Sequence, residues 1–182
     1  LYDKLMGTSA GIGMRRGVIP IYIALCLRKY KRHFVIQDSH SEVKLTPALL
    51  NQINEHPESY TIFVEEWTDE KEAYTNGLAD TFCDYVIEKE KLYGTYPYIS
   101  LAMNRWYLSL PKFTKESTKI YKDGALTKIG SEFSNFIKLM RQPNIGAQEL
   151  LFSRMAKCFN CDVANSALLN RVIEAKKFFD TF

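Results

Sequence analysis

The sequence has few cysteines and no long apolar run, and each shortage excludes a class of protein. Four cysteines in 182 residues are too few for the disulfide framework of a small secreted domain, so we expect a reducing, cytoplasmic environment. The longest apolar run, residues 18–27, is half of the roughly 20 residues that a membrane span needs, so we expect no membrane partner. No secretion signal is recognisable, and the start at Leu1 rather than at a methionine suggests a piece of a longer protein.

The sequence also lacks the patterns of common nucleotide and metal sites. No Gly-x-x-x-x-Gly-Lys-Ser/Thr loop is present, so we do not expect this segment itself to bind ATP. Cys158 and Cys161 have CxxC spacing without a second pair, whereas structural zinc takes four ligands in paired motifs. The three histidines are isolated from one another. We therefore expect no metal ion and no cofactor.

One catalytic motif is present, a Gly-x-Ser-x-Gly at residues 7–11 with Ser9 at its centre. In hydrolases this motif exposes a nucleophilic serine at a strand-turn-helix elbow. Its letters GTSAG, together with Asp123-Gly124-Ala125, are similar to the two catalytic elements of patatin-like lipases. However, the sequence predicts neither a convincing strand nor a glycine-rich oxyanion loop before Ser9. We expect Ser9 not to be a nucleophile, the segment not to be an enzyme, and Asp123-Gly124 to be a turn.

Charge is distributed unevenly along the chain. Residues 1–35 carry seven bases against one acid, and residues 55–90 carry two bases against eleven acids. Residues 91–182 are basic again, with fourteen bases against seven acids. Such asymmetry indicates either a nucleic-acid surface or two oppositely charged parts of one protein that attract each other.

The hydrophobic pattern predicts a mainly α fold with a small β part. Because 46% of the residues are hydrophobic, the chain can bury a core, and its length fits one domain or two small ones. We expect a winged-helix-like αβ module over residues 1–67, followed by a helical bundle over residues 68–182. The elements predicted in the module are a buried helix over 18–30, a hairpin from 33–37 and 42–45, a helix starting at Thr46-Pro47 and a strand over 60–64.

In the second part, apolar residues recur at helical spacing. The stripes predict one helix from about Asp69 to Leu92, one over Ile99–Leu110 that Pro111 ends, and one over Leu126–Met140. Two more helices are expected, one from Gly146 through Met155 and a last one that carries Leu168 to Phe179. Seven apolar side chains are expected to share one helical core: Ile99, Met103, Trp106, Leu126, Phe133, Phe136 and Met140.

A longer resemblance concerns the front module. Residues 13–24, GMRRGVIPIYIA, are similar to the Gly-Leu-Arg-x-Gly-x-Ile-Pro run that opens an apolar helix in large bacterial P-loop ATPases of phage-defence systems, the bacteriophage-exclusion ATPase and its relatives. Leu45-Thr46-Pro47 resembles the helix start that follows a hairpin in those proteins, and residues 110–152 resemble a later segment. The resemblance implies a non-ATPase region of a multi-domain protein. It implies no reaction.

These observations predict a non-catalytic accessory domain that contributes duplex DNA contact or assembly with other domains of the same parent chain. The residues expected to contact DNA phosphates are Arg15, Arg16, Lys29, Lys31, Arg32 and Lys44. A protein-interaction scaffold is the alternative, because the acidic segment 55–90 would neutralise this basic cluster if it folded over it. A patatin-like hydrolase fragment is a further alternative.

Overall fold

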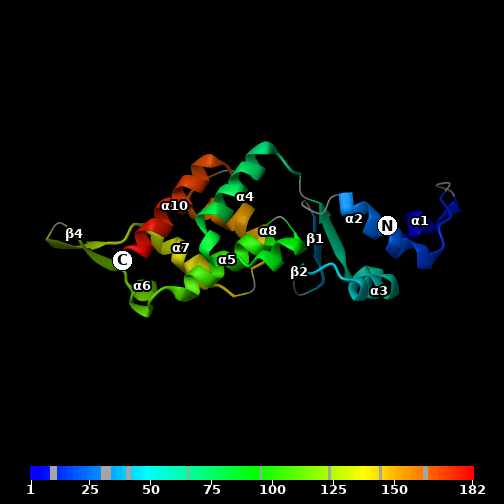
Figure 1. The fold of residues 1–182 in the computed structure, drawn as a ribbon, viewed down its shortest axis with the longest axis horizontal. Coiled ribbons are helices and arrows are strands. Elements are labelled where there is room, and N and C mark those ends of the chain that lie inside the picture. Colours follow the sequence, from blue (N-terminus) through cyan, green and yellow to red (C-terminus); the bar gives the residue numbers. More distant parts are fainter. Residues whose placement is uncertain are drawn as a thin grey trace. The chain divides into compact units, whose positions relative to one another are not determined.

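The computed structural model describes residues 1–8, 12–29, 34–39, 42–64, 66–94, 96–122, 124–143, 145–161 and 164–182. In these ranges the chain is mainly helical with small antiparallel sheets (Figure 1), as the sequence predicted. It separates into two compact units, which are unit 1 (Leu1–Glu66 with Tyr93–Thr95) and unit 2 (Trp67–Leu92 with Tyr96–Phe182). None of the described helices combines the length and apolarity that crossing a bilayer requires.

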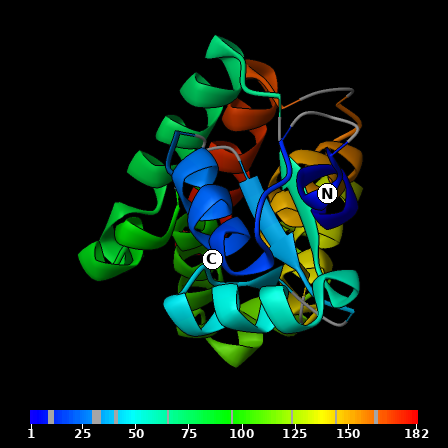
Figure 2. The same ribbon diagram turned by 90° about the vertical axis from the view of Figure 1, so that its right-hand side faces the viewer.

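Unit 1 packs helices against one face of a three-stranded sheet (Figure 2). Its elements are α1 (Tyr2–Met6), a 3-10 turn η2 (Arg16–Val18), α2 (Ile19–Lys29), β1 (Phe34–Gln37), β2 (Glu42–Val43), α3 (Pro47–Glu55), η3 (Pro57–Ser59) and β3 (Thr61–Val64). The strand order is β2-β1-β3, and both pairs are antiparallel. Thr46 caps α3 as its sequence predicts, because its Oγ1 accepts from the Leu49 backbone N at 3.1 Å.

Helix α2 is buried on one side only, which corrects the prediction of a buried helix. Ile19, Ile23 and Leu27 lie in the core with Ile36 of the sheet. On the outer face, Ile21 and Leu25 are each 62% exposed. The reason is geometric: a helix in a two-layer unit this small meets neighbours along a single stripe, and an apolar sequence does not create a second layer to cover the other side.

Unit 2 is a helical assembly with one hairpin. The elements after residue 67 are α4 (Asp69–Thr81), η4 (Cys83–Tyr85), η5 (Glu88–Tyr93), α5 (Pro97–Ser109), α6 (Lys112–Glu116), β4 (Lys119–Lys122), β5 (Ala125–Lys128), α7 (Ser131–Arg141), α8 (Ala147–Glu149), a π-helical turn η6 (Leu150–Arg154), α9 (Met155–Cys158) and α10 (Ser166–Asp180). The helix expected from Asp69 to Leu92 therefore ends at Thr81, and the chain continues in the short 3-10 helices η4 and η5.

The core of unit 2 is aromatic and is centred on Trp106, which is fully buried. The centroid of its ring lies 5.4 Å from the centroid of the Phe82 ring and 5.7 Å from that of the Phe136 ring. Its Nε1–H donates to Oδ1 of Asp180 at 2.7 Å. Trp106 on α5 thus contacts the end of α4, α7 and the end of α10. Ile99, Met103 and Met140 are buried as predicted, and Phe133 is half-buried.

The prediction of a helix over Leu126–Met140 is wrong at its start. Leu126 belongs to β5 and is 67% exposed, so it is not part of the core. Strands β4 and β5 pair antiparallel from Lys119↔Lys128 to Lys122↔Ala125. Gly124 has a φ of +78°, which a glycine adopts without strain, and it lets the chain reverse there. The helix begins only at Ser131.

Replacing Trp106 by alanine should lower the free energy of unfolding by about 3–5 kcal/mol, because it leaves a large cavity among packed aromatic rings. Trp106→Phe keeps a ring but loses the hydrogen bond to Asp180, which should cost about 1–2 kcal/mol on its own. Urea denaturation followed by circular dichroism measures both. An unchanged urea midpoint for Trp106→Ala would contradict this description of the core.

Candidate nucleic-acid interface

The structure describes the side chains of three of the six predicted DNA-binding residues. Arg15 and Lys44 are exposed. Lys29 is the last residue of α2, and its side chain lies outside the described part. Lys31 and Arg32 lie outside the described residues, as do Ser9 and Asp123 of the hydrolase motif. For these positions the expectations drawn from the sequence stay predictions.

The Arg16 side chain forms hydrogen bonds within unit 1. Its Nε donates to the Asn54 carbonyl at 3.1 Å, and its Nη2 donates to the carbonyls of Asn54 and Glu55 at 2.7 and 3.2 Å. These carbonyls end α3, where a cation also favours the negative end of the helix dipole. Arg16 therefore fastens the start of α2 to the end of α3.

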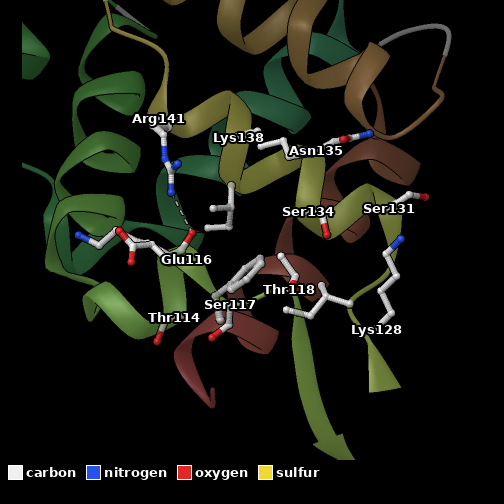
Figure 3. A pocket seen from close by; sticks show the side chains of 14 residues that line it. Thr114, Glu116, Ser117, Thr118, Lys128, Ser131, Ser134, Asn135, Lys138 and Arg141 are labelled. Atoms are coloured by element: carbon white, nitrogen blue, oxygen red, sulfur yellow. Dashed lines mark hydrogen bonds between the residues drawn. The ribbon is translucent and has the colours of Figure 1, made fainter. Parts of the chain in front are cut away.

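A second basic surface, which the sequence did not single out, lies in unit 2 (Figure 3). It is a depression of about 620 Å³ bounded by α6, the base of the β4–β5 hairpin, α7 and the end of α10. We call it the basic groove. It is lined by Thr114, Lys115, Glu116, Ser117, Thr118, Lys128, Ile129, Ser131, Ser134, Asn135, Ile137, Lys138, Arg141 and Phe179.

The floor and the rim of the basic groove differ in chemistry. Ile129, Ile137 and Phe179 are buried and supply an apolar floor. The rim carries hydroxyl, amide and cationic groups, and Figure 3 shows Lys128 and Arg141 on opposite sides of the depression. A rim of this composition offers hydrogen-bond donors from several directions to a ligand that rests on the floor.

Helix α7 supplies five residues of this rim, and these polar residues recur at helical spacing. They are Ser131, Ser134, Asn135, Lys138 and Arg141. Each of them lies three or four positions from at least one other, so the five share one face. The opposite face of α7 buries Phe136 and Met140 in the core of unit 2. The same amphipathic pattern that holds the helix in place thus aims its donors at the groove.

Two of the four cations in the groove are held by the fold. Arg141 donates from Nη2 to the Lys115 carbonyl at 3.1 Å, and a hydrogen bond with Tyr107 raises the pKa of its guanidinium further. Lys115 donates to the Leu108 carbonyl at 3.0 Å, and its Nζ lies 5.2 Å from the centre of the Tyr107 ring. Arg141 and Lys115 therefore connect α5, α6 and α7.

The other two cations, Lys128 and Lys138, are exposed. Within the described part of the chain, no ion pair involves either of them. Glu116 is the acid among the lining residues, against four bases. The groove is therefore a cationic site with two ammonium groups that are available to an anion.

Sequence reasoning missed this site because its cations are spread over residues 115–141 and no two of them are adjacent. One signal was present. Asp123-Gly124, flanked by the alternating runs KIYK and ALTK, is a strong hairpin pattern. The helical stripe from Leu126 instead favours the prediction of a turn followed by a helix. The turn at Gly124 was right, but the element that follows it is a strand.

The cysteines give no metal centre among the described residues, where no group of three or more histidine, cysteine or acidic side chains is close enough to hold an ion. Cys158 Sγ lies 3.7 Å from the Glu132 carbonyl oxygen, and burial raises the pKa of its thiol to about 12, with a smaller contribution from the Glu132 carboxylate. A thiol with this pKa stays protonated at neutral pH, so it is neither a good ligand nor a nucleophile.

Cys158 should therefore resist alkylation. At pH 8 its thiolate fraction is lower than that of an ordinary cysteine by about three orders of magnitude, so iodoacetamide should label exposed Cys26 and Cys83 long before Cys158. Peptide mapping by mass spectrometry at timed intervals gives the three rates, and the urea-unfolded protein is the control in which they should converge. Equal rates in the folded protein would contradict the protonated, buried state of Cys158.

Comparison with known proteins found no family model, curated protein or solved structure that matches this chain. The basic groove is therefore interpreted from its own geometry and charge.

Proposed function

We propose that this chain is a non-catalytic accessory segment of a larger bacterial ATPase of the phage-defence type, and that it contacts the phosphates of duplex DNA. The observation that carries the DNA contact is the basic groove, in which Lys128 and Lys138 face solvent beside hydroxyl and amide groups. Lysine, arginine, serine, threonine and asparagine side chains are the groups that contact DNA phosphates. Such contacts position a protein on a duplex without selecting a sequence.

The parent protein and the fold type of unit 1 belong to the same proposal. The resemblance of residues 13–24 and of Leu45-Thr46-Pro47 to the phage-defence ATPases supports the parent assignment. The order of helix, hairpin, helix and strand, together with a three-stranded antiparallel sheet, supports a winged-helix-like unit 1. Arg15 and Lys44 of unit 1 are exposed and are proposed as a second, weaker phosphate contact.

Reversing the charge of the two available lysines should weaken duplex binding and flatten its salt dependence. Each phosphate contact contributes about −0.9 to the slope of log K against log salt concentration, so Lys128→Glu with Lys138→Glu should make the slope less negative by about 1.8 or more. Fluorescence anisotropy of a labelled duplex, titrated at several salt concentrations, measures the slope.

The matched control reverses Lys89 and Lys157, which are exposed lysines of unit 2 that do not line the groove. It changes the net charge equally, so it should alter the affinity and the slope much less. Absence of duplex binding at low salt would refute the proposal. If Arg15→Glu with Lys44→Glu lowers the affinity for duplex DNA more than the reversal of Lys128 and Lys138 does, the main DNA contact lies in unit 1.

A second candidate function, assembly with another domain of the parent chain, is favoured by the outer face of α2. Ile21, Tyr22 and Leu25 of α2 are exposed there, as is Val18 of the preceding turn η2. Large apolar side chains that gather on one exposed face are typical of a contact surface. Cys26 on the same helix is also exposed, so it reports whether this face is covered.

If another domain covers α2, Cys26 should be alkylated more slowly in the complete parent protein than in this segment alone, because the covering domain excludes the reagent. Ile21→Asp with Leu25→Asp should restore fast labelling in the parent protein. The rate at Cys83, in unit 2, should not respond to this variant and is the internal control. Equal labelling of Cys26 in segment and parent would exclude assembly through α2.

A further inference from the structure

One face of the β4–β5 hairpin joins a cationic pair to an apolar pair. In the observed register, Lys119 lies opposite Lys128, and Tyr121 lies opposite Leu126. Because side chains alternate along a strand, these four share one face, which we call the hairpin face. Tyr121 is 75% exposed and Leu126 is 67% exposed. Within unit 2 the hairpin extends beyond the helices, as Figure 1 shows.

Both pairs are unfavourable in the free protein. Like charges directly opposite each other destabilise a strand pair, and the ion pairs of the described residues involve neither Lys119 nor Lys128. Tyr121 and Leu126 leave apolar surface in water on a two-stranded hairpin, an element of marginal stability by itself. A ligand that brings a negative charge between the lysines and an apolar surface onto Tyr121 removes both penalties.

A nucleotide has this combination of groups. Two residues along a strand span roughly 6.6–6.8 Å, which is the distance between the cationic pair and the apolar pair. This distance is on the scale of the separation between a nucleotide's phosphate and its base. A phosphate held by Lys119 and Lys128 therefore directs its base toward Tyr121 and Leu126. Aromatic side chains stack on bases of any sequence, because every base has a flat face.

The hairpin face is also continuous with the basic groove, because Lys128 belongs to both. A duplex held in the groove would therefore end, or open, beside Tyr121. In a fully paired duplex the base faces are covered by their neighbours, and a base must be unstacked before a side chain can lie against it. The exposed ring of Tyr121 consequently favours a base that is already unpaired.

We propose that the hairpin face binds the first unpaired nucleotide at the junction of duplex and single-stranded DNA. Tyr121 stacks on its base, Leu126 contacts the same apolar surface, and Lys119 and Lys128 hold its phosphate. The inference rests on the function proposed for the basic groove, and it narrows the ligand from duplex DNA to a forked end.

The test uses a forked DNA with 2-aminopurine at the first unpaired position and a blunt duplex with the same paired sequence. The fork should bind more tightly, on the order of 10-fold, because one base is stacked. Stacking on Tyr121 should quench the 2-aminopurine fluorescence. Tyr121→Ser should lose both effects yet keep salt-dependent binding of the blunt duplex, whereas Tyr121→Phe should retain both. Thr127→Ala, on the other face of the hairpin, is the matched control and should behave as wild type.

Equal affinity for fork and blunt duplex, or quenching that persists in Tyr121→Ser, would overturn this inference while leaving the proposed function intact. A rise in the fluorescence of 2-aminopurine placed inside the blunt duplex would also overturn it, because the hairpin would then unstack paired bases. If neither DNA binds at low salt, the proposed function fails as well.

Discussion

The architecture of unit 2 depends on the burial of one indole ring. Trp106 lies between Phe82 and Phe136 and donates its N–H to Asp180, so a single side chain joins α5 to the end of α4, to α7 and to the end of α10. Lys176 Nζ donates to Oδ2 of Asp180 at 2.6 Å, so both oxygens of the carboxylate that accepts from the indole are hydrogen-bonded. The hydrophobic effect favours this packing, and the hydrogen bond gives it one orientation.

The candidate interface follows from that core. Phe136 and Ile137 are neighbours on α7, and the first packs on Trp106 while the second forms part of the groove floor. Phe179 of α10 completes the floor one residue before Asp180. Helix α7, which carries five of the rim residues, is therefore fixed by the core. The β4–β5 hairpin buries little and carries Lys128 at its base and the exposed Tyr121. A cationic groove beside a projecting hairpin is the arrangement from which both proposals start.

The sequence predicted the elements whose signals are local, such as the Thr46 cap of α3 and the stripe of Ile99, Met103 and Trp106 on α5. The sequence did not predict features that depend on how distant parts of the chain pack, such as the exposure of a helix face or the shape of a surface. The apolar run of α2 did not reveal that Ile21 and Leu25 are largely exposed. The basic groove was missed for a related reason: a run of bases in the sequence indicates where the chain is charged, whereas concavity arises from contacts between residues far apart.

The most direct test of the account is to map where the protein contacts DNA. Backbone amide chemical shifts of the ¹⁵N-labelled chain, recorded while a short forked duplex is added at low salt, report each residue separately. We expect the largest changes between Ser117 and Arg141, in the hairpin and on α7, with smaller changes near Arg15 and Lys44. Changes confined to unit 1, or uniform small changes along the whole chain, would contradict the assignment of the basic groove as the nucleic-acid interface.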